Sequence, residues 1–453
     1  ASHYLAEFNM GYNGTENFAK GKRFGFFPAV SLGWVISEEK FFPKNNIVKY
    51  LKVRGSYGEV GNDQIGGDRF LYLPSSYGAA SDSGVNKYNF GLASNPYTSL
   101  MIVENKIGNP DLTWEKAKKM NVGVDINLFN NCLTASFDIF KEKRNNILAN
   151  RSTSPMIIGA NLPAYNFGEM ENRGWEMDLN FRHHIQDFHY WARFNYSFAR
   201  NEIIYMDEVQ KRYDYQMTTG RRKNQFFGLI FDGYYNSWEE INALDRPKSS
   251  WSGNQLQPGD VKYIDVNQDG VIDDYDMVPI GYTPVPEIIY GFSFGAQYKG
   301  FDFSILFQGA DNVSIKYFGR SMWPFAKGEE SAKSLIKERW TQERYEAGEK
   351  ITFPRLSLNP NGETDHNYRP STLWIRDASY LRLKNLEVGY TFTGGFVKRL
   401  NLNSVRLYFN GSNLFTWTDV VDLDPEAPSR SGNVEINTYP LQKVYNIGLN
   451  INF

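Results

Sequence analysis

One acidic stretch of the chain has the residue types and the spacing of a calcium-binding loop. In "DVNQDGVIDDYD", residues 265–276, oxygen-bearing side chains stand at loop positions 1, 3, 5, 9 and 12, with glycine at position 6. Ca²⁺ takes six to eight hard oxygen ligands, and the glycine allows the sharp turn that such loops need. The predicted ligands are Asp265, Asn267, Asp269, the carbonyl of Val271, Asp273 and Asp276.

The same residues also suit an acidic surface turn, because Asn, Asp and Gly are ordinary turn residues. No convincing helices flank the loop, so we expect a structural Ca²⁺ that closes a long loop rather than a calcium sensor. Position 12 is Asp276 instead of the longer glutamate, which weakens a bidentate contact.

The segments around this loop alternate apolar and polar residues one by one, which is the pattern of β-strands with two different faces. In 188–198 the even positions are Phe, Tyr or Ala and the odd ones are mostly polar, and 290–298 repeats the pattern with Phe292 and Phe294. We expect about twelve such strands. They lie near 3–14, 23–36, 47–59, 116–129, 131–148, 167–183, 187–204, 286–299, 301–316, 373–393, 404–417 and 441–453. A phase slip near Lys384–Asn385 predicts a β-bulge.

The connections between these strands alternate between long and short. Short turns on one side and long loops on the other are typical of an outer-membrane β-barrel, and they place the C-terminus in the periplasm. The largest extracellular loop, 205–285, then carries the calcium-type loop. The long connections are 60–115, 149–166, 205–285, 317–372 and 418–440, and the short ones are 37–46, Asn130, 184–186, Lys299–Gly300 and 394–403.

The amino-acid composition further limits the classes of protein to which the chain can belong. The formal net charge of -2 gives no strong electrostatic case for nucleic acid or for an anionic lipid surface, and the single cysteine, Cys132, excludes a disulfide framework. No apolar run is long enough for a transmembrane helix. A soluble β-sandwich also alternates, but its inner faces are apolar, whereas these polar faces carry Asp, Glu, Arg and Asn. We therefore predict an all-β, transmembrane antiparallel barrel.

Ordered motifs from end to end resemble those of the SusC/RagA-like TonB-dependent transporters of Bacteroidota outer membranes. The matching stretches are "VRGSYGEVGND" (53–63), "IGNPDLTWEKAKKMNVGVD" (107–125), "NFGEMENRGWEMDL" (166–179), "GDVKYIDVNQDGVIDDYD" (259–276), "KERWTQE" (337–343), "YLRLKNLEVGYTF" (380–392), "NGSNLFTWT" (410–418), "DLDPEAP" (422–428) and the terminal "YNIGLNINF". The terminal Phe453 also looks like the last-strand signal read by the outer-membrane assembly machinery.

The resemblance implies a barrel of about 22 strands, with residues 1–453 forming its C-terminal portion. It implies an integral protein of the outer membrane that is no enzyme and imports oligosaccharides or peptides actively. The implied partners are a SusD-like surface lipoprotein and the TonB–ExbB–ExbD complex, which is contacted by an N-terminal part that we expect to be absent here together with the plug. A passive porin and a calcium-dependent surface binding or adhesion module remain as alternatives.

Other candidate features lie in the loops. The loop aromatics could stack on sugar rings or contact the lipoprotein. The carboxylate pairs Glu169–Glu171 and Glu239–Glu240 could suggest glycoside hydrolysis, but acidic residues are common on lumen-facing strands. Residues 331–346 predict a helix capped by Ser331. The candidate substrate-binding aromatics are Trp238, Trp251, Tyr282, Trp323 and Trp374.

Overall fold

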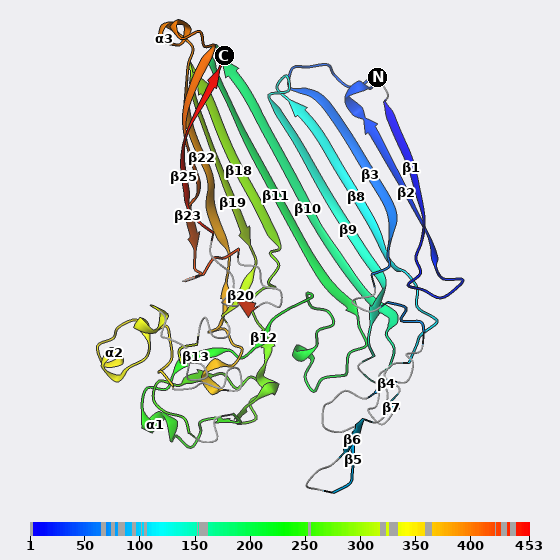
Figure 1. Cartoon of the computed structure of the whole chain (residues 1–453), viewed down its shortest axis with the longest axis vertical. Helices are drawn as coiled ribbons and strands as arrows, with labels where there is room; N and C mark the ends of the chain where they lie inside the picture. The colour runs from blue at the N-terminus through cyan, green and yellow to red at the C-terminus, as the bar shows by residue number, and fades with distance from the viewer. Residues whose placement is uncertain are drawn as a thin grey trace.

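Most of the chain forms one large β-sheet or belongs to the long loops at one end of that sheet (Figure 1). The computed structural model describes residues 3–64, 69–73, 78–79, 87–92, 97–100, 102–103, 107–151, 153, 162–251, 255–317, 323–325, 334–357, 365–421, 423–426, 433–434 and 441–453.

The main sheet has twelve antiparallel strands whose spatial order follows the chain. This confirms the predicted all-β class and the predicted number of crossing segments. The first and last strands lie at the two edges, and no pairing joins them among the described residues. The strands are β1 (Tyr4–Gly14), β2 (Phe24–Val35), β3 (Val48–Asn62), β8 (Glu115–Leu128), β9 (Leu133–Ala149), β10 (Tyr165–Ile185), β11 (Phe188–Tyr205), β18 (Ile288–Tyr298), β19 (Phe301–Asp311), β22 (Tyr380–Phe392), β23 (Ser404–Thr418) and β25 (Val444–Asn452).

The two faces of the sheet differ as the alternation predicts. Cross-strand partners share a face, and the pairs Leu179–Phe194 and Phe194–Phe292 are aligned by the register. Phe292 is 42% exposed and Ile447 is 81% exposed, so the apolar face is not buried between two stacked sheets. The sandwich alternative is therefore excluded. No helix in the described part of the chain is long and apolar enough to cross a membrane.

The predicted β-bulge is confirmed. The pairing of β22 with β23 shifts between Leu383 and Asn385, and the pairing with β19 shifts at the same place. Lys384 is therefore the extra residue, and it moves the apolar side chains on either side of it onto the same face.

Short turns join the strands at the end of the sheet where both chain termini lie, and the long loops gather at the opposite end (Figure 1). The turn between β22 and β23 contains the short helix α3 (Gly395–Arg399). Small elements in the long loops include α1 (Trp238–Ile241), β13 (Phe231–Tyr234), β15 (Val261–Tyr263), β20 (Ser314–Tyr317) and β21 (Ile375–Asp377).

Two of the long loops fold together around their own hydrophobic core, and we call the described residues of 226–285 and 313–378 the loop assembly. Leu229 and Val261 are fully buried in this core. Such a core holds loops that would otherwise lose too much conformational entropy on ordering. The core residues are Leu229, Tyr234, Val261, Tyr263, Ile272, Val313, Ile315, Tyr317, Trp323, Trp340, Phe353, Tyr368, Leu373, Trp374 and Ala378, with Val420 added from the next loop.

The single helix predicted over 331–346 is wrong. A short 3-10 helix spans Ser334–Glu338 and the helix α2 spans Gln342–Glu346, while the first three predicted residues lie outside the described ones. Between them Trp340 belongs to neither helix, donates its backbone N–H to the carbonyl of Phe353 at 2.8 Å and is buried in the core. Thr341, not Ser331, caps the second helix. Burial of the indole outweighs the local preference for a continuous helix.

Candidate functional site

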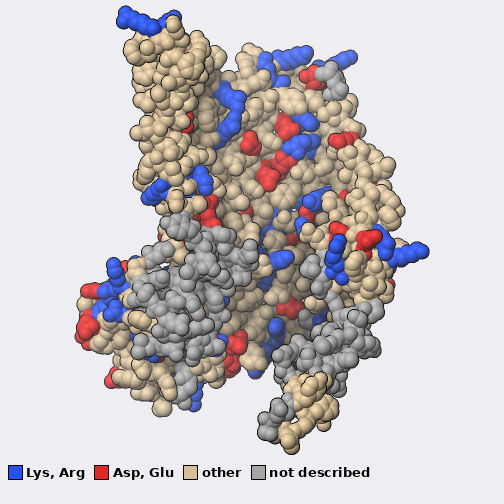
Figure 2. All heavy atoms as spheres, viewed as in Figure 1, with Lys and Arg blue, Asp and Glu red and all other residues tan. Residues whose placement is uncertain are grey.

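The polar face of the sheet carries ion networks that connect neighbouring strands. Arg54 of β3 bonds Asp125 of β8 at 3.1 Å and Asp138 of β9 at 2.6 Å. A Cβ at Gly123 would lie 2.5 Å from an Asp138 oxygen and 2.7 Å from Arg54, so glycine leaves the room that this network needs. Figure 2 shows acidic and basic side chains gathered on the face of the sheet turned to the viewer.

A second network of this kind lies near the other edge of the sheet. Arg406 of β23 bonds Asp302 of β19, and it bonds Glu387 of β22 at 2.6 Å. A Cβ at Gly389 would lie 2.7 Å from both Arg406 and Asp302. Partly hydrated charges of this kind line a wet interior, because an apolar protein core would penalise them strongly.

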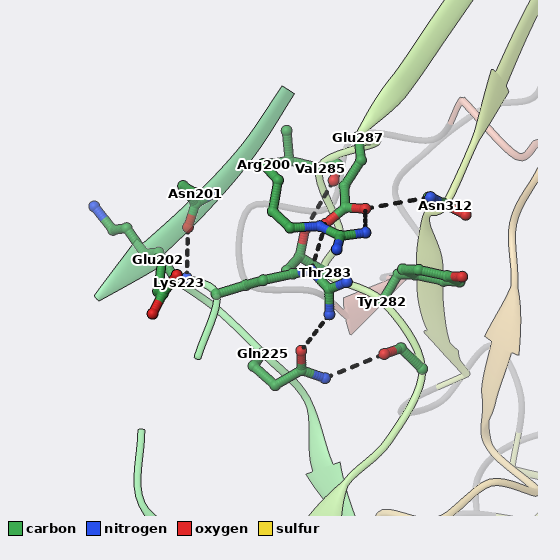
Figure 3. Close-up of polar contacts among 12 residues, drawn as sticks. Arg200, Asn201, Glu202, Lys223, Gln225, Tyr282, Thr283, Val285, Glu287 and Asn312 are labelled. Atoms are coloured by element: carbon green, nitrogen blue, oxygen red, sulfur yellow. Dashed lines mark hydrogen bonds and ion pairs between the residues drawn. The ribbon is translucent and has the colours of Figure 1, made fainter. Parts of the chain in front are cut away.

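Glu287, the residue directly before β18, connects the sheet to the largest loop (Figure 3). Arg200 of β11 donates to its two carboxylate oxygens at 3.0 and 2.8 Å, and Arg222 of the loop donates to the first of them. Asn312 donates to the second at 3.2 Å. The Glu287 side chain is only 4% exposed. One buried carboxylate therefore ties together two strand ends and a loop.

The charge of Glu287 is stabilised by its partners. Burial by itself raises the pKa of the Glu287 carboxyl, but hydrogen bonds from Arg200 and Arg222, and their positive charges, lower the pKa overall. The carboxylate is therefore ionised at neutral pH. Next to it, Glu142, Arg144, Asn172, Lys223 and Thr283 are among the residues that line a cavity of about 270 Å³.

Arg382 performs a similar function for the loop after β23. It is 2% exposed and bonds Asp424 at 2.7 Å and Glu426 at 2.5 Å. Tyr380 donates to the same Glu426 at 2.6 Å. Burial raises the pKa of Asp424, but the bond from Arg382 and the backbone N–H groups of Glu426 and Leu441 lower it overall. This cluster fastens the described part of the loop against β22.

The predicted calcium loop forms a tight turn in the loop assembly. Asp265 accepts from the backbone N–H groups of Gln268 at 2.7 Å and Gly270 at 2.8 Å. Asp276 is fully buried and accepts from Val266 at 2.8 Å and Asp273 at 2.9 Å. Among the described residues, no group of three or more His, Cys, Asp or Glu side chains is placed to hold a metal ion. The hard-oxygen donor set still suits Ca²⁺ chemically, and the calcium site stays a prediction.

The side chains of the other predicted ligands also accept hydrogen bonds from nearby backbone N–H groups. Asn267 accepts from the N–H of Asp269 at 3.0 Å, Asp269 from that of Val271 at 2.9 Å, and Asp273 from that of Tyr275 at 2.7 Å. These are the side-chain turns that the acidic-turn interpretation expects.

The five candidate aromatic residues have different environments. Trp323 and Trp374 pack in the core of the loop assembly, and Trp251 packs against it with the Arg369 guanidinium 4.1 Å from its ring. Tyr282 is half-buried, with Arg222 5.4 Å above its ring. Trp238, at the start of α1, is 54% exposed. The structure therefore brings Trp251, Trp323 and Trp374 together in one hydrophobic core, and of the five only Trp238 presents a largely free ring.

Three of the four residues of the acidic pairs Glu169–Glu171 and Glu239–Glu240 form ion pairs. Glu169 pairs with Lys143 and Glu171 with Lys141, each at 2.9 Å, and Glu240 pairs with Lys262 at 2.6 Å. Pairs held in this way serve structure, in keeping with the low expectation for glycoside chemistry.

The sequence alone does not identify Glu287 or Arg382 as residues that anchor the loops. The only local signal is that Glu287 is a charged residue directly before an alternating strand, and Arg382 a charged residue between Leu381 and Leu383. Their partners lie 87 and 44 positions away, at Arg200 and Glu426, so the pattern of one segment does not identify the pairs.

A twelve-stranded antiparallel sheet with one apolar and one charged face defines a transmembrane β-barrel wall of the outer membrane. The model of the family described as "TonB dependent receptor-like, beta-barrel" matches residues 6–414, and the chain belongs to this family. The family consists of transporters rather than enzymes, and the likeness to SusC and RagA confirms the resemblance read from the motifs.

Among curated relatives, the TonB-dependent receptor P3 of Formosa agariphila is 28% identical over all of this chain and 44% of its own length. The TonB-dependent receptor SusC of Bacteroides thetaiotaomicron is 27% identical over all of this chain and 42% of its own length. The structure of the RagAB peptide transporter matches with a TM-score of 0.73 at 23% identity, covering 99% of this chain and 46% of that one. The chain spans less than half the length of these relatives.

Proposed function

We propose that the chain forms part of the wall of an energised importer that carries oligosaccharides or peptides across the outer membrane. The observation that supports this most is the charged inner face, where the Arg54 and Arg406 networks border a route for polar cargo. The relatives agree in kind, since one is named SusC and the RagAB structure is described as a peptide transporter.

The loop assembly is the proposed docking surface for a SusD-like surface lipoprotein. It has a core of its own, so it presents a firm surface rather than a set of independent loops. Energy would come from the TonB–ExbB–ExbD complex through a plug segment, as the resemblance implies. Calcium at residues 265–276 would stabilise the same assembly by closing its largest loop.

Uptake by living cells tests the transport proposal. Cells that express the transporter should accumulate a labelled oligosaccharide or a labelled peptide of a size that porins exclude, and deletion of the gene should abolish this uptake. An uncoupler that collapses the proton gradient should abolish it equally. Uptake that persists with the uncoupler would instead support a passive porin, and cell-surface binding without accumulation would support an adhesion module.

Two matched substitutions test the docking surface. Val261 is fully buried in the loop assembly, whereas the side chain of Leu244 is fully exposed. We expect Val261→Asp to abolish co-purification of the lipoprotein while the barrel keeps its heat-dependent gel mobility. Leu244→Asp introduces the same charge and should leave co-purification unchanged. Retention of the lipoprotein by Val261→Asp, with the loop assembly open to protease, would contradict the proposal.

A further inference from the structure

The apolar outer face of the sheet ends abruptly at a row of basic residues near the long-loop end. Trp175 of β10 pairs with Phe198 of β11, and two residues further on Arg173 pairs with Arg200. Residues two apart on a strand point to the same face, so these arginines share the face of Trp175 and Phe198. Lys141 of β9 lies opposite Arg173 in the same row, where it pairs with Glu171 at 2.9 Å. The apolar face thus gives way to charged side chains within about 7 Å, and Arg173 and Arg200 come first among them.

A pocket of about 410 Å³ opens at this row. Four guanidinium groups line it, and Glu202 is its one acidic lining residue within the described part of the chain. Its lining residues are Arg173, Arg200, Asn201, Glu202, Gly220, Arg221, Arg222, Gln225, Pro279 and Gly281.

The pocket has a net positive charge, because its arginines outnumber the carboxylates that pair with them. Arg200 and Arg222 share the single carboxylate of Glu287. Arg173 approaches Glu202 only at 4.0 Å, and both side chains are well exposed. Among the described residues, the Arg221 side chain has no hydrogen bond or ion pair, although the backbone around it is fixed. Gly220 and Arg221 form hydrogen bonds of 2.7 and 2.8 Å with Ile203 of β11.

The position of the pocket identifies the kind of anion that fits it. In the importer proposed above, on which this step rests, cargo passes along the opposite face, which carries Glu176 and Asp178. Arg173 and Arg200 continue the face that meets lipid. Basic residues where an apolar barrel face ends lie at the level of the lipid headgroups. Phosphate is the strong anion of lipid headgroups, and guanidinium groups bind it with two parallel hydrogen bonds.

We propose that the pocket formed by Arg173, Arg200, Arg221 and Arg222 binds the phosphate of an outer-leaflet lipid headgroup. Arg221 and Arg173 supply the hydrogen bonds that are not already used inside the protein. Arg200 and Arg222 are held in place by Glu287 and add positive charge behind the phosphate. A bound lipid would thereby fasten the β11 end and the neighbouring loop segment to the membrane surface.

The test measures lipid binding to the intact transporter, extracted in mild detergent and stripped of lipid. Native mass spectrometry follows titration with phosphorylated outer-leaflet glycolipid, with the same glycolipid after phosphatase treatment, and with inorganic phosphate. The double variant Arg173→Gln/Arg221→Gln leaves both bonds to Glu287 in place, so the sheet should still fold. Lys398→Gln, an exposed lysine of α3 at the other end of the barrel, removes a positive charge as the control.

We expect the double variant to bind the phosphorylated glycolipid at least about tenfold more weakly, the control to bind like the wild type, and phosphatase treatment to remove the difference. Equal glycolipid binding by the double variant and the wild type would overturn the proposal. Inorganic phosphate that binds as tightly as the glycolipid would also overturn it and identify a site for free phosphate. Substrate uptake is a separate measurement, so either result leaves the transport proposal to its own test.

Discussion

Arg200 of β11 donates two side-chain hydrogen bonds, of 3.0 and 2.8 Å, to Glu287, the residue directly before the neighbouring strand β18. A backbone hydrogen bond links the same two segments, since the N–H of Ala199 donates to the carbonyl of Glu287 at 2.8 Å. Arg222 approaches the same carboxylate from the loop. The end of the barrel wall and the start of the extracellular structure are therefore fixed by one acidic side chain.

Removal of this charge should loosen the loop without unfolding the barrel. We expect Glu287→Gln to weaken local protection of residues 218–226 by about 2 kcal/mol, since two charge-assisted interactions are lost. Hydrogen exchange of peptides from this segment measures the effect. Glu202→Gln serves as the control, because its ion pair with Arg173 is long and exposed. Unchanged exchange in Glu287→Gln would show that the loop is held by other contacts.

The same carboxylate predicts an acid-sensitive loop. Its pKa is lowered in the folded protein, so its contribution to stability is complete above the ordinary glutamate pKa of about 4.3. The contribution is lost as the pH falls through the lowered folded-state pKa. Protease sensitivity of residues 218–226 should therefore rise below about pH 4 in the wild type. Glu287→Gln should be sensitive at neutral pH already, and an equal acid step in this variant would contradict the assignment.

Arg382 should be among the most costly single charges to remove. Arg382→Met leaves Asp424 and Glu426 partly buried and without their main partner, which costs about 3 kcal/mol. Limited proteolysis should then cut near residues 423–426. Lys384→Met removes a longer contact of 3.5 Å to the same Glu426 from a more exposed side chain, and it should cost below about 1 kcal/mol. Equal effects of the two substitutions would argue against the buried cluster as the anchor.

The opposite characters of the two faces predict different tolerance to charge. Phe292→Arg places a cation on the lipid face and should destabilise the membrane-inserted barrel by about 2–4 kcal/mol, depending on its depth. Ser293→Arg, one residue further along β18, places it on the wet face and should be tolerated. Urea unfolding in lipid vesicles measures both. A larger loss from Ser293→Arg would reverse the assignment of the faces.

Chelation tests the calcium prediction. We expect EGTA to make residues 259–276 accessible to protease while the heat-dependent gel mobility of the barrel stays the same. Added Ca²⁺ should restore protection, and added Mg²⁺ should not, because Mg²⁺ demands stricter octahedral geometry. Proteolysis that does not change after chelation would favour the acidic turn already visible in the hydrogen bonds of Asp265 and Asp276.

The sequence by itself determined the strands, their two faces, the sides on which short and long connections lie, and even the bulge at Lys384. These features depend on alternation with a period of two residues. That alternation is visible within each strand's own sequence. The family could be recognised for the same reason, since its motifs lie in and beside the strands.

Only the tertiary structure decided how the loops are used. Trp340 is not helical, although the surrounding sequence favours a helix, because its indole is buried in a core formed by distant loops. Glu287 meets Arg222 across 65 positions and Arg382 meets Asp424 across 42, and both pairings depend on the paths of loops that carry no repeating pattern. Long-range burial and charge pairing outweigh local preference there, so the loop sites could be found only once the loops were placed in space.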